Sequence, residues 1–244
     1  MFEPVSSTYT DLIACEETRQ AVLVDPVLPA WQRDLEALKD LGLQLAVTLD
    51  THIHADHITA ASRLRRETGS AIAHPAIDAL SCADRPVREG EPLMLGSIRL
   101  DPLSTPGHTD GHHAYLLGDR VLTGDALLID GCGRTDFQGG DAATLYRSIH
   151  DKLFSLPGET LVYPAHDYEG RCVSSIAQER QRNPRLGGGR PMQAFVNIMA
   201  DLDLPYPKFI DFALPGNRAC GVCPEDIPEH LQGYCDRISN SRQG

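Results

Sequence analysis

Long hydrophobic runs are missing from this sequence. No apolar stretch approaches the ~20 residues that a membrane-spanning helix needs. The opening residues Met1–Ser7 lack the basic region and the apolar region of an export signal, and no Arg-rich transit pattern is present. We therefore expect a cytoplasmic protein that does not contact membranes.

Basic residues are fewer than acidic residues. The chain has 22 Lys and Arg residues against 34 Asp and Glu residues, which gives a net charge of −12. A general nucleic-acid binder or anionic-membrane binder needs a basic surface, so both classes are disfavoured. An anionic substrate would need a local basic pocket. The 244 residues, 41% of them hydrophobic, are enough for one large domain with a sizeable core.

The cysteines form no obvious framework. Seven of them are spread over the chain, and the odd number without an export signal favours free thiols over disulfides. A lone C-x-x-C occurs at Cys220-Gly-Val-Cys223, but a structural zinc would need two more ligands at similar spacing. The seven positions are Cys15, Cys82, Cys132, Cys172, Cys220, Cys223 and Cys235.

Hydrophobic periodicity predicts a mixed order of strands and helices. This order favours an α/β protein, a four-layer αββα sandwich of mixed sheets. We expect a single domain over 1–244, with a short helical and Pro-rich C-terminal segment from about 173. Predicted strands are Tyr9–Ala14, Ala21–Asp25, Leu45–Asp50, Ser70–His74, two within Pro92–Leu103, His112–Leu117, Arg120–Leu122 and Leu161–Tyr163. Predicted helices are Trp31–Leu43, Ile58–Thr68, Asp141–Phe154, Val173–Arg182 and Gln193–Ala200.

Potential metal ligands are concentrated in one short stretch. Thr51-His-Ile-His-Ala-Asp-His57 places three histidines and one aspartate within six positions, between a predicted strand and a predicted helix. In layered α/β proteins, ligands gather at the carboxyl ends of strands. Imidazole and carboxylate suit zinc, iron and other first-row metals. The stretch therefore predicts a metal site.

Three other predicted strands end in the same kinds of residue. His108 lies on a Pro-Gly turn, Asp125 follows Thr123-Gly124, and His166 follows Pro164-Ala165. Each alone has an ordinary explanation as a turn or capping residue. Together with the 52–57 cluster, they favour one convergent metal site.

The full set, H-x-H-x-D-H followed by His, Asp and His, resembles the signature of the metallo-β-lactamase superfamily, whose fold is an αββα sandwich. Four segments look more specifically like the persulfide dioxygenases of that superfamily. The glyoxalase II hydrolases, the nearest rival, carry a longer helical C-terminal domain, whereas only two helices are predicted here. The four segments are 123–138, 163–168, 179–185 and 210–217.

The resemblance implies one Fe(II) per chain, held by His52, His108 and Asp125. Two imidazoles and one carboxylate are the ligand set of many non-haem Fe(II) oxygenases. The same resemblance implies that the other four residues orient these ligands and line the pocket. The alternative is a second metal and a binuclear glutathione thioester hydrolase of the glyoxalase II kind, because all seven ligands are intact. The four residues are His54, Asp56, His57 and His166.

The implied reaction converts glutathione persulfide, O₂ and water to glutathione and sulfite, a step of sulfide detoxification. The sulfane sulfur rises from oxidation state 0 to +4, which releases the four electrons that one O₂ takes up. Because glutathione carries two carboxylates, Arg134 and Arg218 are candidates for binding it. Tyr168 is a candidate hydrogen-bond donor near the persulfide, and Cys220 is a candidate redox thiol without a catalytic role.

A third hypothesis needs no enzyme. Cys220 and Cys223 would make the chain a carrier of sulfur or metal, and replacing both would abolish that activity while sparing a dioxygenase. The sequence allows a homodimer but does not decide the oligomeric state.

Overall fold

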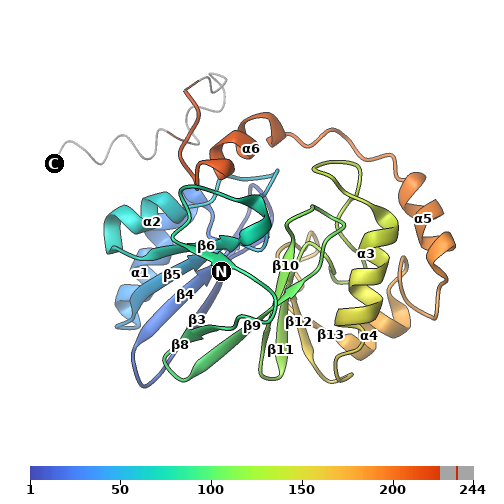
Figure 1. Cartoon of the computed structure of the whole chain (residues 1–244), viewed down its shortest axis with the longest axis horizontal. Coiled ribbons are helices and arrows are strands. Elements are labelled where there is room, and N and C mark those ends of the chain that lie inside the picture. The colour runs from blue at the N-terminus through green and yellow to red at the C-terminus, as the bar shows by residue number, and fades with distance from the viewer. Residues whose placement is uncertain (226–234, 236–244) are drawn as a thin grey trace.

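Two sheets packed face to face form the centre of the molecule (Figure 1). The computed structural model describes residues 1–225 and residue 235. The first sheet contains β3 (Asp11–Ala14), β4 (Gln20–Val24), β5 (Gln44–Leu49), β6 (Ala71–Pro75) and β7 (Arg85–Val87), in that order. The second has the order β13-β12-β11-β10-β9-β8. Its strands are β8 (Leu93–Leu95), β9 (Ile98–Ser104), β10 (His113–Leu117), β11 (Arg120–Gly124), β12 (Leu161–Pro164) and β13 (Ser174–Ser175).

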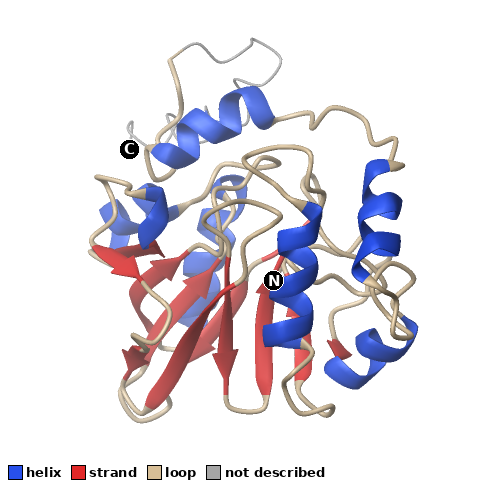
Figure 2. Cartoon of the chain, turned by 45° about the vertical axis from the view of Figure 1, so that its right-hand side comes forward, coloured by secondary structure: helices blue, strands red, loops and turns tan. Residues whose placement is uncertain are grey.

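Helices cover the outer face of each sheet (Figure 2). The helices α1 (Trp31–Asp40) and α2 (Ala61–Thr68) pack on the first sheet. The helices α3 (Ala142–Ser148), α4 (Ile176–Arg182) and α5 (Met192–Ala200) lie beside the second, and a turn of π-helix over Ile149–Leu153 extends α3. The last helix, α6 (Ile210–Arg218), joins the core of α1 and α2. The predicted αββα fold is therefore confirmed.

A separate apolar layer lies between the sheets. Alternate residues of β4 and β5, Val22, Val24, Val47 and Leu49, face Tyr115 and Leu122 of the second sheet. These side chains are almost fully buried. Because strand side chains alternate between faces, the other face of each sheet packs against its helices. Burial on both faces fixes the two sheets relative to each other.

The strand directions bring several chain ends to one edge. β4, β5, β6 and β7 run parallel, so the residues that follow β4 and β5 lie at the same edge. β11 and β12 are also parallel, while β9, β10 and β11 are antiparallel. A hydrogen bond from the His113 N–H to the Thr51 carbonyl (2.9 Å) joins the two sheets at this edge. The predicted metal ligands all follow or precede strands there.

Helix α6 was not predicted. The last thirty residues, 215–244, were expected to be Pro-rich and irregular, yet Pro215 lies inside the helix; residues 226–234 and 236–244 of that stretch lie outside the described residues. Buried Phe212 and Ala213 pack in one core cluster with residues of α1 and α2, so tertiary packing outweighs the low helix propensity of proline. The described C-terminal segment after 173 thus has three helices rather than two.

The prediction that all cysteines are free thiols is wrong. Cys82 bonds to Cys220, and Cys223 bonds to Cys235. Cys15, Cys132 and Cys172 are free. Cysteine spacing could not reveal the first bond, because its two residues are 138 positions apart and meet only when α6 folds against the end of the first sheet. None of the helices within the described residues is long and apolar enough to cross a membrane.

One carboxyl group of the first sheet makes stability depend on pH. Burial raises the pKa of Asp11 in β3 to about 7, and the negative charge of Asp25 acts in the same direction. A raised carboxyl pKa costs nothing below about pH 4, where the group is protonated in both states; the cost grows between pH 4 and pH 7 and is largest above pH 7, where the folded protein must also ionise it. Asp11→Asn should therefore raise the free energy of unfolding by up to about 4 kcal/mol at pH 8 and by about a third as much at pH 5, in urea titrations. An equal gain at both pH values would contradict this.

Candidate metal centre

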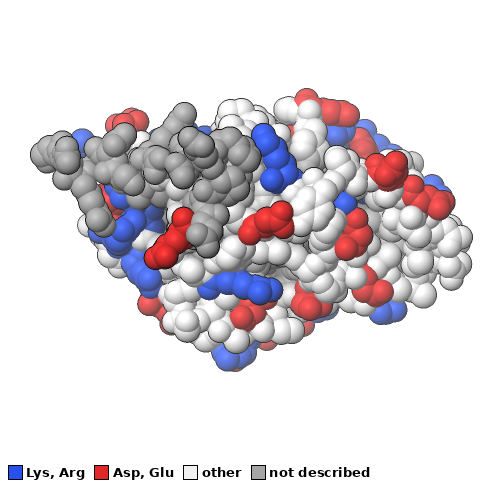
Figure 3. Space-filling view, turned by 90° about the horizontal axis from the view of Figure 1, so that it is seen from above, with Lys and Arg blue, Asp and Glu red and all other residues white. Residues whose placement is uncertain are grey.

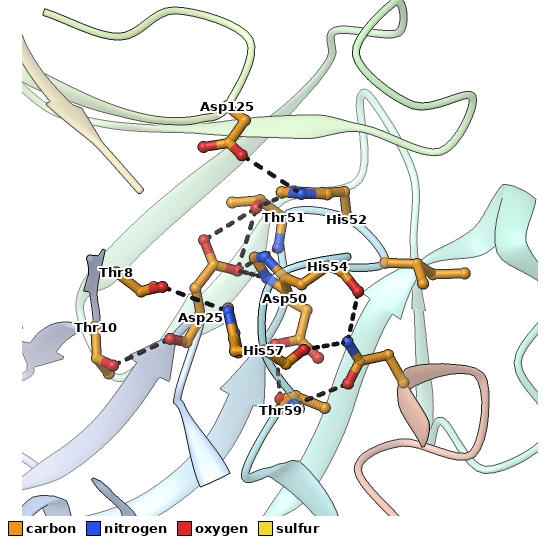
Figure 4. A network of polar contacts seen from close by, with 12 residues as sticks. Thr8, Thr10, Asp25, Asp50, Thr51, His52, His54, His57, Thr59 and Asp125 are labelled. Atoms are coloured by element: carbon orange, nitrogen blue, oxygen red, sulfur yellow. Dashed lines mark hydrogen bonds and ion pairs between the residues drawn. The ribbon is translucent and has the colours of Figure 1, made fainter. Parts of the chain in front are cut away.

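Three strand ends bring His52, His108 and Asp125 together. His52 follows β5, His108 lies on the turn between β9 and β10, and Asp125 follows β11. The Oδ2 of Asp125 is 3.9 Å from the Nε2 of His52 and 3.5 Å from the Nε2 of His108. All three ligand atoms lie within 4.8 Å of one another. Figure 4 shows His52 and Asp125 pointing toward each other.

Each of the three side chains is oriented by a contact on its other polar atom. The Nδ1 of His52 is 2.8 Å from the Thr51 hydroxyl, which itself donates to Asp25. The Nδ1–H of His108 donates to the Arg134 carbonyl (2.7 Å). The Nδ1–H of His166 donates to the Oδ1 of Asp125 (2.6 Å). Two imidazole Nε2 atoms and one carboxylate oxygen are left facing a shared space, and this donor set fits a first-row metal.

Asp25 supports this arrangement from behind. It follows β4, is 3% exposed, and accepts hydrogen bonds from the backbone N–H of Thr51 (2.7 Å) and from the Thr51 hydroxyl (2.9 Å). It also accepts from the Nε2–H of His54 (2.9 Å), as Figure 4 shows. Burial opposes a charged His54, but the carboxylate of Asp25 outweighs it and raises the pKa of His54 to about 9. The Nδ1 of His54 is buried without a partner among the described residues.

A second chain of contacts reaches Asp125 through Asp56. The Oδ2 of Asp56 accepts from the Nδ1–H of His57 and from the Nε2–H of His166, both at 2.9 Å. His166 therefore lies between two carboxylates. Burial opposes its charge, but Asp125 and then Asp56 raise the pKa of His166 well above its usual value. The hydroxyl of Thr8 is 3.0 Å from the Nε2 of His166, which crowds that nitrogen further.

Three residues that could hold a second metal ion also lie close together. One ligand atom from each of His54, Asp56 and His57 lies within 4.8 Å of the others. His166 differs from these three, because both of its ring nitrogens already contact carboxylates. The geometry therefore brings the seven predicted residues to one place and separates His52, His108 and Asp125 as one group within them.

His112 also belongs to the site and was missed. It precedes β10, is fully buried, and contacts the Thr105 hydroxyl through Nδ1 at 2.8 Å. Its Nε2 accepts from the backbone N–H of Asp125 (3.1 Å), and burial lowers the pKa of His112 well below its usual value. A neutral imidazole is the form that can accept this bond. In the sequence, His112 is the first residue of a predicted strand and is followed by His113. Nothing in that pattern indicates a contact with Asp125.

Gly124 is required where β11 meets the site. Its φ is +51°, and a Cβ there would lie 2.5 Å from the Nε2 of His112. Gly124→Ala should therefore displace His112 and the backbone of Asp125, and lower metal content by at least about tenfold. Metal analysis after gel filtration checks this. Gly118→Ala is the matched control, because Gly118 also has a positive φ (+57°) but nothing within 4 Å of a Cβ. Equal metal content in the two variants would contradict the prediction.

A cavity of about 820 Å³ opens onto the ligands. Among its lining residues are His108, Asp125, His166, Arg134 and Tyr168. The Arg134 guanidinium forms two hydrogen bonds with Asp136 (2.7 and 2.6 Å), and Tyr168 is 77% exposed. On the face drawn in Figure 3, basic and acidic side chains of the described residues are interspersed. Because the two signs are interspersed, an anion that binds on this face would have to be held by a few nearby basic side chains.

Two other predicted residues do not line the cavity. Arg218 is an exposed residue at the end of α6 and is not among the residues that line the cavity, so its assignment to substrate stays a prediction that this cavity does not support. Cys220 is buried and bonded to Cys82, so it is not the free redox thiol that was expected. The sequence could not distinguish these two positions from Asn217, whose side chain donates a hydrogen bond to the carbonyl of His54 in the ligand-bearing turn, residues 52–59.

Comparisons with known proteins agree with the αββα fold. The family model described as the metallo-beta-lactamase superfamily matches residues 10–166. The human protein named persulfide dioxygenase ETHE1, mitochondrial, is 49% identical over 226 residues, which cover 91% of this chain and 87% of that protein. The crystal structure of ETHE1 from Myxococcus xanthus superimposes with a TM-score of 0.88 at 53% identity, covering 91% of this chain and 97% of the other. A hydroxyacylglutathione hydrolase from Polaromonas is 34% identical over 175 residues, which cover 69% of this chain and 65% of that protein.

Proposed function

This chain belongs to the metallo-beta-lactamase superfamily, and we propose that within it the protein is a persulfide dioxygenase. The observation that carries the proposal is 49% identity to the human persulfide dioxygenase over nine-tenths of the chain, together with the His52, His108 and Asp125 group. The hydrolase relative is less similar and matches a smaller share of the chain. The similarity to the human persulfide dioxygenase also disfavours a sulfur or metal carrier based on Cys220 and Cys223. Both of those cysteines are in disulfides.

We propose that the resident metal is one Fe(II) ion, held by His52, His108 and Asp125. Two imidazoles and one carboxylate suit a non-haem Fe(II) centre. When bound, Fe(II) would supply open coordination positions and redox chemistry, which zinc lacks. The residues His54, Asp56, His57 and His166 would orient these ligands through the Asp25 and Asp56 contacts rather than hold a second metal.

Two histidines of the protein, His166 and His112, would hold Asp125 in place by hydrogen bonds. His166, kept protonated between Asp56 and Asp125, would fix the direction of the Asp125 carboxylate, so that its Oδ2 faces the two histidines. Neutral His112 would hold the Asp125 backbone from the other side. The His166 bond limits rotation of the Asp125 side chain and the His112 bond fixes its backbone, so the ligand would be preorganised before metal arrives.

The proposed substrate is glutathione persulfide. Its tripeptide fits the size of a cavity of about 820 Å³, and the sulfur end would lie at the ligands. Tyr168 lines the cavity near His166, with ring centroids 6.4 Å apart, and is placed to donate a hydrogen bond to the substrate. Arg134 also lines the cavity, although Asp136 already occupies one edge of its guanidinium. The reaction balances as glutathione persulfide, O₂ and water giving glutathione, sulfite and two protons.

The test is O₂ uptake by protein loaded with Fe(II) or with Zn(II), in the presence of glutathione persulfide. The Fe(II) form should consume one O₂ for each sulfite released, and the Zn(II) form should consume none. In parallel, both forms are given S-lactoylglutathione. Turnover of the persulfide by the Zn(II) form, or hydrolysis of the thioester as the faster reaction, would overturn the proposal. The cytoplasmic location stays a prediction, and the human relative carries the word mitochondrial in its name.

A further inference from the structure

Helix α6 holds the backbone of the ligand-bearing turn through one side chain. Asn217, in the last turn of α6, is 3% exposed. Its Nδ2 donates to the carbonyls of His54 and His57, both at 2.8 Å. Its Oδ1 accepts from the backbone N–H of Thr59, also at 2.8 Å. One amide therefore satisfies three backbone groups of residues 54–59, which are more than 150 positions away in the sequence.

An asparagine is well matched to these three groups. Two carbonyls and one N–H call for two donors and one acceptor on a single short side chain, and an amide group offers them. Residues 52–59 have no helix or strand of their own, so their buried backbone groups need partners from elsewhere. Figure 4 shows that the same turn carries His52, His54 and His57. The conformation of the turn sets the direction of these imidazoles.

The chain after Asn217 is packed closely on the same turn. The backbone N–H of Ser62 donates to the Cys220 carbonyl (2.9 Å). A Cβ on Gly221 would lie 2.1 Å from the Thr59 carbonyl oxygen, and the φ of Gly221 is +90°. The disulfide from Cys220 to Cys82 then ties this segment to the loop before β7. Hydrogen bonds and close contact hold 216–221 against 54–62, and the disulfide fixes the same segment to Cys82.

We propose that Asn217 is a positioning residue for the metal-binding turn, and that the Cys82–Cys220 disulfide keeps it in place. The proposal rests on the proposed metal site. Asn217 contacts neither the cavity nor the ligand group, so it acts through the backbone of His54 and His57. From there, the Asp56 and His166 contacts lead to Asp125. Loss of such supporting contacts costs about 10- to 100-fold in metal affinity in other proteins.

The test compares Asn217→Ala with Asn183→Ala in the full-length protein. Asn183 is a matched control, because it is 2% exposed and also bonds three backbone groups, those of Gly131, Arg185 and Leu186. The readouts are the dissociation constant for Zn(II) or Fe(II), by competition with a chelator, and the melting temperature of the metal-free protein. We expect metal affinity to fall at least tenfold for Asn217→Ala and less than threefold for Asn183→Ala, while both variants lower the melting temperature.

Metal affinity is measured without turnover, so this test is independent of whether the enzyme oxidises persulfides. Unchanged affinity in folded Asn217→Ala would overturn the proposal, and so would an equal loss in Asn183→Ala. If Asn217→Ala does not fold, Asn217→Gln is measured instead, because its longer side chain cannot keep all three bonds in register. In that case, unchanged affinity of the glutamine variant would overturn the proposal.

The disulfide has its own matched pair of variants. The double substitution of Cys82 and Cys220 by alanine removes the bond nearest to Asn217, and the same change at Cys223 and Cys235 removes the other. We expect the first variant to bind metal about threefold to tenfold more weakly than the parent, and the second to bind normally. Equal affinities in the two variants would contradict a role for the Cys82–Cys220 bond in positioning.

Discussion

Asp125→Ala is expected to remove both the bound metal and the activity. Asp125 contributes the only carboxylate of the proposed ligand group, and its Oδ2 lies 3.5 Å from the Nε2 of His108. Burial works against its charge, but the neighbouring His166 holds the pKa of Asp125 well below its usual range, so the carboxylate is ionised at any physiological pH. We expect kcat/KM for persulfide oxidation to fall at least about a thousandfold, and metal content to fall to near zero.

The control for this prediction is Asp130→Asn. Asp130 lines the same cavity but pairs with Arg171 (2.7 Å) rather than with the histidines. Metal content by plasma emission and O₂ uptake should separate the two variants, with normal metal content in Asp130→Asn. An Asp125→Ala protein that keeps one metal per chain and one-tenth or more of its activity would show that the ligand group is wrongly assigned.

Asp25→Ala should have the largest effect on stability. The carboxylate of Asp25 is 3% exposed and accepts hydrogen bonds from the Thr51 N–H, the Thr51 hydroxyl and the Nε2–H of His54. Removing it leaves a buried imidazole and a buried backbone N–H without partners. Loss of one member of a buried, hydrogen-bonded ion pair costs about 3–5 kcal/mol. For a chain of this length, this corresponds to a melting temperature lower by roughly 10 °C.

Melting curves of the metal-free proteins test this without a contribution from metal binding. Asp101→Ala is the control, because Asp101 forms an ion pair with Arg99 on the protein surface (2.7 Å), and exposed pairs contribute at most about 1 kcal/mol. A melting temperature for Asp25→Ala within 2 °C of that of Asp101→Ala would contradict the role given to Asp25.

The sequence was sufficient to predict the fold and to predict that the candidate ligands lie close together, for physical reasons. Alternating and continuous apolar runs predicted most strands, such as Gln44–Leu49, within one or two residues. Ligands gather at the carboxyl ends of strands in layered α/β proteins, so residues such as His52 and His166, which follow predicted strands, were expected to meet. The spacing H-x-H-x-D-H is dense enough to be specific. Helix ends were less certain, because α2 begins at Ala61 rather than at Ile58.

The supporting residues could not be predicted, because their roles depend on tertiary contacts. Asp25 read as the end of a strand, His112 as the start of one, and Asn217 as part of a Pro-rich tail. Each contacts the site through a hydrogen bond across at least 13 positions of sequence. The pairing of Cys82 with Cys220 is of the same kind, since neither neighbouring sequence indicates the other. Periodicity and motif spacing carry no information about such contacts.

The central claim is a single Fe(II) ion on His52, His108 and Asp125. The most direct test is a crystal structure of iron-loaded protein, with anomalous scattering measured on both sides of the iron edge, alongside metal analysis of the same sample. We predict about one iron per chain, within roughly 2.0–2.3 Å of the Nε2 atoms of both histidines and of the Oδ2 of Asp125. Two metal ions on either side of Asp125, with His54, Asp56 and His57 bound to one of them, would contradict the claim and favour the hydrolase alternative.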